Sequence, residues 1–132
     1  MSANPPKVII MTASKFAVVA FTDEPMNEVR NPVAAERVVS GDPQHHTCVF
    51  FQSEDGALVT GAWTSTPGRW HALIDREEFC SIVAGHCRLI SEDGTVREFK
   101  TGDAFLVPNG FRGDWEVIET TTKHFVIRKY ES

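Results

Sequence analysis

The sequence predicts an all-β domain, folded as a sandwich or a closed barrel. Between residues 67 and 113, short apolar segments alternate with turn residues, namely Gly68, Gly85, Gly94, Gly102, Gly110 and Gly113, with Pro108 beside the last turn. Glycine adopts sharply turned or left-handed backbone at little cost, so turns can separate short strands there. The chain shows no helical periodicity of useful length and no internal repeat. Many short strands with this spacing are typical of sandwiches and barrels.

Composition fits one globular domain. The 132 residues suffice for a single core, and 42% are hydrophobic and 23% charged. A net charge of −5 without a clustered basic face argues against a nucleic-acid partner. No apolar run approaches the ~20 residues that span a bilayer, and the N-terminus lacks a signal-like pattern, so we predict a cytoplasmic protein without a membrane partner. The three cysteines, Cys48, Cys80 and Cys87, form neither an even framework nor a CxxC pair, which indicates reduced thiols.

The N-terminal part is predicted to be an arm. Residues 8–10 follow two prolines and are expected to form a tail that can become an edge strand. Residues 16–21 are continuously apolar, which is consistent with a buried strand or with an arm packed on a partner. Residues 22–36 contain two prolines, which remove backbone donors. We therefore expect this segment to be irregular, with one short helical turn near residues 33–37.

Nine strands are expected after residue 41. Apolar and β-branched runs between turn signals predict strands at residues 47–52, 57–66, 69–74, 78–84, 86–91, 95–100, 104–107, 112–119 and 123–129. Turns are expected at residues 53–56 and 92–94. Alternation along the strands predicts three inward-facing sets: Glu78, Cys80 and Ile82; Gly113, Trp115 and Val117; and Lys123, Phe125 and Ile127. Glu78 and Lys123 are thus predicted to share one interior.

The spacing of several of these residues resembles the two sequence motifs of the cupin barrels. Glu78 is followed after six residues by Gly85, and Gly102 is followed after five by Pro108 and then by Gly110. More narrowly, residues 42–130 resemble the small single-domain cupins grouped with the cupin domain of ureidoglycine aminohydrolase, within the RmlC-like superfamily. The positions that carry this likeness are Gly61, Trp63, Pro67, Gly68, Asp75, Glu78, Phe79, Cys80, Glu92, Asp93, Gly94, Gly102, Asp103, Pro108, Gly110, Phe111, Gly113, Trp115 and Glu116.

The resemblance implies a fold and an assembly. The expected fold is a jelly-roll β-barrel of two antiparallel sheets over residues 41–132. Residues 1–40 form an arm that is either part of the same fold or a contact between subunits. The arm is rich in valine and phenylalanine but too short for a core of its own, so a homodimer is expected, as in other cupins.

The resemblance also points to a metal site and shows that it is incomplete here. Metal-binding cupins offer two histidines in an HxH motif, a glutamate shortly after, and a third histidine beyond the second motif. The corresponding glutamate is Glu78, the HxH region begins at His71 or one residue later, and the third position is Gly113. Glu78 and His71 are therefore the candidate ligands for a divalent ion such as Mn, Fe, Ni or Zn, and such a site needs a further donor such as Cys80. The glycine is expected to leave room beside Trp115 for a small-molecule pocket.

The predicted pocket is lined by Trp63, His71, Glu78, Cys80, Phe105, Trp115 and Lys123. Glu78 is a metal ligand, a general base with a pKa raised by burial, or one half of a buried ion pair with Lys123. Two roles are open for Lys123. If it is buried, its pKa is lowered and it acts in proton transfer or forms a Schiff base. Otherwise its side chain extends to the mouth of the barrel. The histidines and the cysteine of residues 45–48 either bind a metal or belong to a solvated loop.

Three functions are compatible with these residues. The first is a cupin that binds a small molecule of undetermined identity. The second, implied by the resemblance to ureidoglycine aminohydrolase, is a metal-dependent enzyme acting on a nitrogen-rich small metabolite, with Glu78 and Lys123 as catalytic candidates. The third is a structural barrel with a filled interior. An incomplete metal-ligand set favours the first of these functions.

Overall fold

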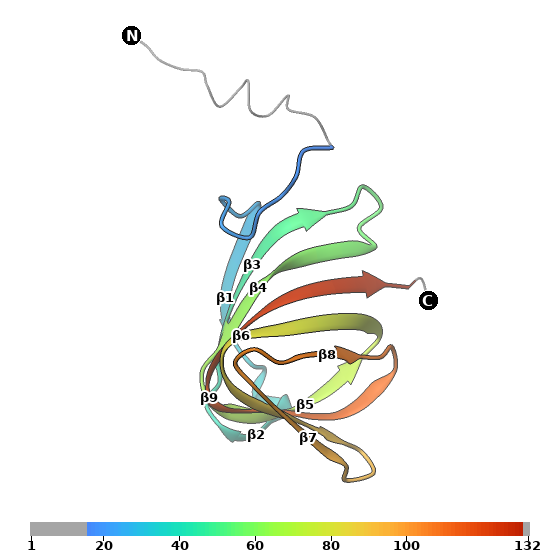
Figure 1. The fold of residues 1–132 in the computed structure, drawn as a ribbon. Coiled ribbons are helices and arrows are strands. Elements are labelled where there is room, and N and C mark those ends of the chain that lie inside the picture. Colours follow the sequence, from blue (N-terminus) through green and yellow to red (C-terminus); the bar gives the residue numbers. More distant parts are fainter. Residues whose placement is uncertain (1–15, 131–132) are drawn as a thin grey trace.

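Nine antiparallel strands joined in one curled sheet make up the fold in the computed structural model, which describes residues 16–130 (Figure 1). They are β1 (Asn27–Pro32), β2 (Val38–Gly41), β3 (Gln44–Gln52), β4 (Leu58–Ser65), β5 (Gly68–Ile74), β6 (Arg76–Ser91), β7 (Val96–Lys100), β8 (Ala104–Val107) and β9 (Phe111–Lys129). A single 3-10 turn, η1 (Ala35–Arg37), is the one helical segment in the described range, and it is too short to cross a membrane. The predicted all-β fold is confirmed. The strand expected at residues 8–10 lies outside the described residues.

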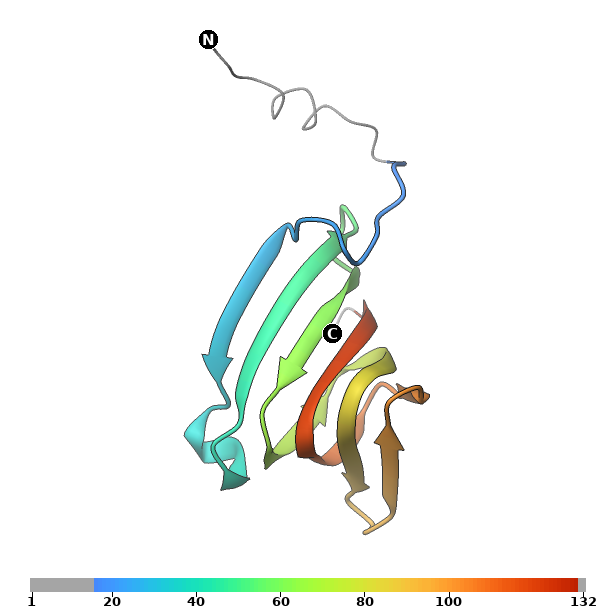
Figure 2. The same ribbon diagram turned by 60° about the vertical axis from the view of Figure 1, so that its left-hand side comes forward.

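The two long strands β6 and β9 hold the sheet together. β9 pairs with β6 along one edge, and its other edge pairs with β5 over residues 111–117 and with β4 over residues 121–128. The sequence predicted two shorter strands in place of each, but both strands bend and continue instead. The register of β6 against β9 shifts between Ile82 and Cys87, where Gly85 has a φ of +115°. Because these strands belong to both halves of the barrel, the two expected sheets form one continuous sheet (Figure 2).

Residues 27–41 pair with the strands of the barrel. β1 pairs with β3, and β2 pairs with β5. The helical turn expected near residues 33–37 is confirmed as η1, but the irregular segment predicted before it is wrong, because β1 forms there. Pro32 is the last residue of β1, which lies at the edge of the sheet, and a missing backbone donor costs little at that position.

Residues 16–21 do not form the buried strand that was one of the two expectations. Phe16 is 83% exposed and Val18 is 95% exposed. The end of the run contacts the sheet: the Phe21 ring stacks on Phe50, with 5.2 Å between centroids, and meets His124 edge-on.

The predicted inward-facing residues are buried, with Gly113 as the exception. Cys80, Ile82, Trp115, Val117, Phe125 and Ile127 belong to the hydrophobic core, and Glu78 and Lys123 are each 4% exposed. Gly113 does not create the room expected beside Trp115. A Cβ atom added at this glycine would lie 2.1 Å from the carbonyl oxygen of Ile90. The glycine therefore permits the close approach of β6 and β9.

We expect Gly113→Ala to destabilise the fold by about 3 kcal/mol, because the added methyl group meets a backbone atom that cannot rotate away. Gly94→Ala is the matched control: its φ of +91° is strained for alanine, but nothing lies within 4 Å of the new Cβ atom. That control should cost only about 1 kcal/mol of backbone strain. Urea unfolding of both variants measures the difference, and equal losses would contradict the packing role of Gly113.

Candidate functional site

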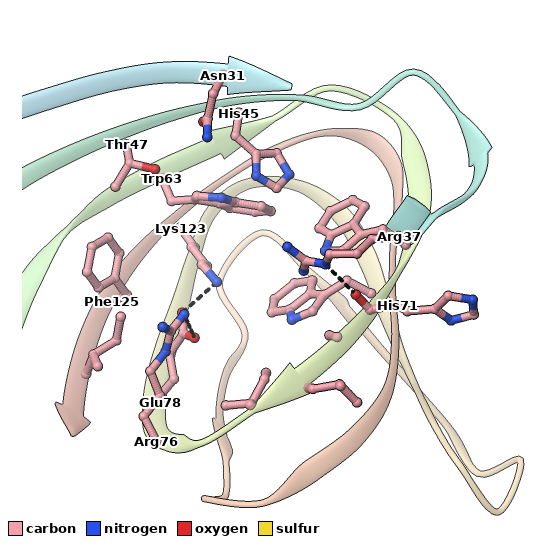
Figure 3. Close-up of a pocket in the computed structure, with 16 residues that line it drawn as sticks. Asn31, Arg37, His45, Thr47, Trp63, His71, Arg76, Glu78, Lys123 and Phe125 are labelled. Atoms are coloured by element: carbon pink, nitrogen blue, oxygen red, sulfur yellow. Dashed lines mark hydrogen bonds and ion pairs between the residues drawn. The ribbon is translucent and has the colours of Figure 1, made fainter. Parts of the chain in front are cut away.

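The curled sheet forms a half-open cavity of about 600 Å³, a volume typical of small-molecule sites (Figure 3). Side chains from β1, η1, β3, β4, β5, β6 and β9 line it. The lining combines the rings of Trp63, Trp70 and Trp115 with the polar groups of Asn31, Arg37, His45, Thr47, Arg76, Glu78 and Lys123. The interior is therefore not packed solid, which argues against a purely structural barrel.

A buried ion pair lies in the wall of this cavity. Lys123 Nζ donates a hydrogen bond of 2.7 Å to Glu78 Oε2, and each side chain is only 5% exposed. The same carboxylate oxygen lies 3.6 Å from Cys80 Sγ, and Oε1 lies 3.9 Å from a terminal nitrogen of Arg76. The shared interior predicted for Glu78 and Lys123 is confirmed.

The two partners hold each other in their charged forms. Burial raises the pKa of the Glu78 carboxyl, but the charge and hydrogen bond of Lys123 outweigh it, so this pKa lies below its ordinary value. Burial lowers the pKa of Lys123, but the Glu78 carboxylate outweighs it and the pKa is raised. The expectations of a raised pKa for Glu78 and a lowered pKa for Lys123 are both wrong. Neither group is a free base or a neutral amine at neutral pH, and the geometry supports the ion-pair interpretation.

Two indole rings lie against the ammonium group. Lys123 Nζ lies 4.4 Å from the ring centroid of Trp63 and 4.2 Å from that of Trp115. A desolvated ammonium over an indole face gains about 2 kcal/mol, which offsets part of the cost of burial. Trp70 lies parallel to Trp115 with 6.3 Å between ring centroids. Trp63 and Trp115 thus both line the cavity, as the sequence predicted, and they also solvate Lys123.

His45 is a lining residue that sequence reasoning missed. Its ring packs edge-on against Trp63 and Trp70, at centroid distances of 4.9 and 4.8 Å. Burial, together with the charges of Lys123 and Arg37, lowers the pKa of His45 to about 4. Its Nε2 atom is buried and has no hydrogen-bond partner in the described part of the chain. The solvated loop expected at residues 45–48 is wrong, because β3 begins at Gln44.

Arg37, Arg76 and Asn31 were also missed. Arg37 comes from η1 and Asn31 from β1, and nothing in their local sequence shows that these elements fold onto the barrel. Arg76 lies two residues before Glu78, so alternation along β6 was a signal that could have placed it beside the carboxylate.

The structure does not bring the His71 imidazole to Glu78. Trp70, Ala72 and Ile74 occupy the inner face of β5, which turns His71 outward (Figure 3). Its side chain is 61% exposed, and its Nδ1 lies 2.8 Å from Asp114 Oδ1. Only its backbone carbonyl faces the site, where it accepts a 3.1 Å hydrogen bond from Arg37 Nε.

Two other predicted pocket residues lie behind the cavity wall. Cys80 is fully buried next to Glu78, and burial raises the pKa of its thiol to about 12. Phe105 stacks on Phe99 at a centroid distance of 3.9 Å and contacts Trp115 from behind. Neither residue is part of the cavity lining.

The residues inside the barrel do not fit a divalent metal ion. Glu78 is held by an ammonium group, the His71 imidazole points away, and Gly113 offers no side-chain donor. Among the described residues, one group of three His, Cys, Asp or Glu donors gathers, and its members Glu28, His46 and Cys48 lie on the outer face. Lys123 supplies the positive charge beside Glu78 that a metal ion would otherwise supply.

Removing one partner of the ion pair should destabilise the protein strongly. We expect Glu78→Gln and Lys123→Met each to lower the free energy of unfolding by about 3–5 kcal/mol, because each leaves a buried charge without its partner. The double variant should be more stable than either single variant, since it buries no charge there. Urea unfolding of the four proteins measures this cycle, and a double variant no better than Glu78→Gln would contradict it.

The pair should also set the pH dependence of stability. The pKa of Glu78 is lowered from 4.5 in the fold, so its contribution is present above pH 4.5 and is lost as pH falls through the lowered value. The pKa of Lys123 is raised from 10.5, so its contribution is present below pH 10.5 and is lost as pH rises through the raised value. Stability relative to the double variant should therefore be flat between these limits and should fall at both extremes. A slope near neutral pH would count against the assignment.

Comparison with known proteins agrees with the observed fold. Residues 52–125 match the family model of the EutQ-like cupin domain. None of the curated proteins is significantly similar in sequence to the chain. Among solved structures, a protein of unknown function of the DUF861 family from Pseudomonas syringae pv. tomato aligns with a TM-score of 0.69 and 21% identity, over 86% of this chain and 46% of that one.

Two EutQ structures are similar as well. The putative ethanolamine utilization protein from Salmonella typhimurium aligns with a TM-score of 0.61 and 12% identity, over 80% of this chain and 98% of that one. The Clostridium difficile EutQ protein aligns with a TM-score of 0.60 and 16% identity, over 67% of this chain and 65% of that one. The chain thus spans less than two thirds of the Pseudomonas and Clostridium proteins, and identities this low show the fold alone. Because the family model covers more than half of its residues, the chain belongs to the family of EutQ-like cupin domains.

Proposed function

We propose that this cupin domain binds a small anionic molecule, of the carboxylate class, in the barrel cavity. The observation that carries the proposal is the charge of the lining. Arg37, Arg76 and Lys123 are cationic, while Glu78 is the one carboxylate, so three positive charges less one negative charge leave an excess of two. The chain as a whole has a net charge of −5. A positive interior in an acidic protein attracts and retains an anion.

The two arginines are the groups left to meet such a ligand. Lys123 already has Glu78 and two indole faces as partners. Arg37 is anchored through Nε to the His71 carbonyl, and within the described residues its terminal nitrogens have no hydrogen-bond partner. Arg76 approaches Glu78 only to 3.9 Å, and its buried Nε has no hydrogen-bond partner among residues 16–130. Guanidinium groups bind carboxylates through paired hydrogen bonds, so an anionic ligand would satisfy donors that the fold leaves unpaired.

The remaining lining suits a flat organic group. Trp63, Trp70 and Trp115 offer indole surface on which a planar or apolar part of the ligand can pack. His45 Nε2 adds a further buried polar atom, to which no described residue donates or accepts a hydrogen bond. The cavity therefore combines cationic groups with an aromatic wall, an arrangement that orients a ligand with one charged end and one planar part.

Phenylacetate and its uncharged isostere phenylacetamide test the proposal. All three tryptophans of the chain line the cavity, so quenching of intrinsic fluorescence reports binding there. We expect the acid to bind about 10-fold more tightly than the amide, which corresponds to about 1.4 kcal/mol. Arg37→Gln and Arg76→Gln should each reduce this preference.

Arg97→Gln is the matched control, because it removes one positive charge from an exposed position on β7, outside the cavity. This variant should keep the preference for the acid. Equal affinity for acid and amide would refute the anionic class while leaving a small-molecule site in place. Failure of both compounds to bind at millimolar concentration would count against the proposed cavity function as well.

A further inference from the structure

A cluster of metal-ligating side chains lies on the opposite face of the sheet from the cavity. Glu28 comes from β1, and His46 and Cys48 come from β3. One carboxylate oxygen, one imidazole nitrogen and the thiol sulfur all lie within 4.8 Å of one another. We propose that Glu28, His46 and Cys48 form a zinc-binding site on the outer face of β1 and β3.

The sheet itself fixes the three positions. Glu28 and Cys48 are direct cross-strand partners in the antiparallel pair of β1 and β3. His46 lies two residues before Cys48 and therefore faces the same side of the sheet. The alternate residues of β3, His45 and Thr47, face the other side and line the cavity. Because strand pairing and not a loop holds the donors together, little conformational freedom remains to be lost when an ion binds.

One of the two donor separations already matches that of a tetrahedral site, and the other is shorter because two donors are in direct contact. His46 Nε2 lies 2.5 Å from Glu28 Oε2, and Cys48 Sγ lies 3.6 Å from His46 Nε2. Zinc bonds of about 2.0–2.3 Å place the donors of a tetrahedral site about 3.4–3.7 Å apart. Small rotations of the Glu28 and His46 side chains therefore open the space for an ion.

The chemistry of the donors selects the metal. A thiolate, an imidazole and a carboxylate are the sulfur, nitrogen and oxygen ligands that zinc takes in proteins, whereas Mg²⁺ and Ca²⁺ prefer oxygen alone. Thiolate and carboxylate together would neutralise the charge of Zn²⁺. Arg30, which lies 3.6 Å from Glu28 Oε2, is the competing cation, and its side chain is 73% exposed and can move into solvent. A fourth position stays open to water because the cluster is only partly buried.

Cobalt, which occupies zinc sites and absorbs light, tests the proposal on the full chain. We expect one equivalent of Co²⁺ to bind with a thiolate-to-cobalt charge-transfer band and Zn²⁺ to displace it. Cys48→Ser should abolish the band, and Glu28→Gln and His46→Ala should each weaken binding at least about 10-fold. Cys87→Ala is the control, because Cys87 is fully buried and is not part of the cluster, so the band should persist.

A second measurement uses the unmodified protein and does not depend on the folding of any variant. Zn²⁺ should slow the alkylation of Cys48 by iodoacetamide, followed by mass spectrometry of peptides, and a chelator should restore the rate. Absence of a charge-transfer band, a band that survives in Cys48→Ser, or alkylation of Cys48 that is unaffected by Zn²⁺ would each overturn the proposal. All three outcomes are independent of ligand binding in the cavity.

Discussion

The buried ion pair between Glu78 and Lys123 is the interaction on which the interior of this barrel depends. Removing a carboxylate and an ammonium from water costs several kcal/mol for each ion, so the fold must supply partners for both. The carboxylate receives the Lys123 hydrogen bond, and the ammonium lies against the rings of both Trp63 and Trp115. Each partner comes from a different part of the sheet. The pairing of β6 with β9 and of β4 with β9 must therefore be in register before the charges are compensated.

This pair also decides which chemistry the cavity can support. A metal ion next to Glu78 would need that carboxylate as a ligand, yet the carboxylate is already held by a fixed cation of the chain itself. Unlike a metal ion, the Lys123 ammonium is part of the chain and does not have to be bound from solution. It keeps Glu78 ionised. Since the two charges compensate each other, the unbalanced charge of the cavity lies on Arg37 and Arg76. The proposed anion site therefore depends on these two arginines, because the carboxylate of Glu78 is already bound by Lys123.

Local alternation predicted the residues of the ion pair. The lining residues that the sequence did not predict, such as Arg37, are placed by pairing between strands. A two-residue period is a local property, so the inward direction of Glu78, Trp115 and Lys123 followed from short stretches of sequence. Arg37 reaches the cavity only because β1 pairs with β3 and β2 pairs with β5, so that η1 between them folds onto the barrel. His71 was placed by motif position and not by alternation, although its apolar neighbours on β5 already occupied the inner face.

One strand, β3, contributes to both proposed sites because its side chains alternate between the two faces of the sheet. His45 and Thr47 face the cavity, and His46 and Cys48 face outward. Among the described residues β1 pairs with β3 alone, so an ion shared between these two strands would add a second link to the backbone hydrogen bonds that join them. β1 also carries Asn31, which lines the cavity. A ligand that binds only one conformation stabilises that conformation. An ion on the outer face would thus favour the conformation in which β1 is paired with β3 and Asn31 lines the cavity.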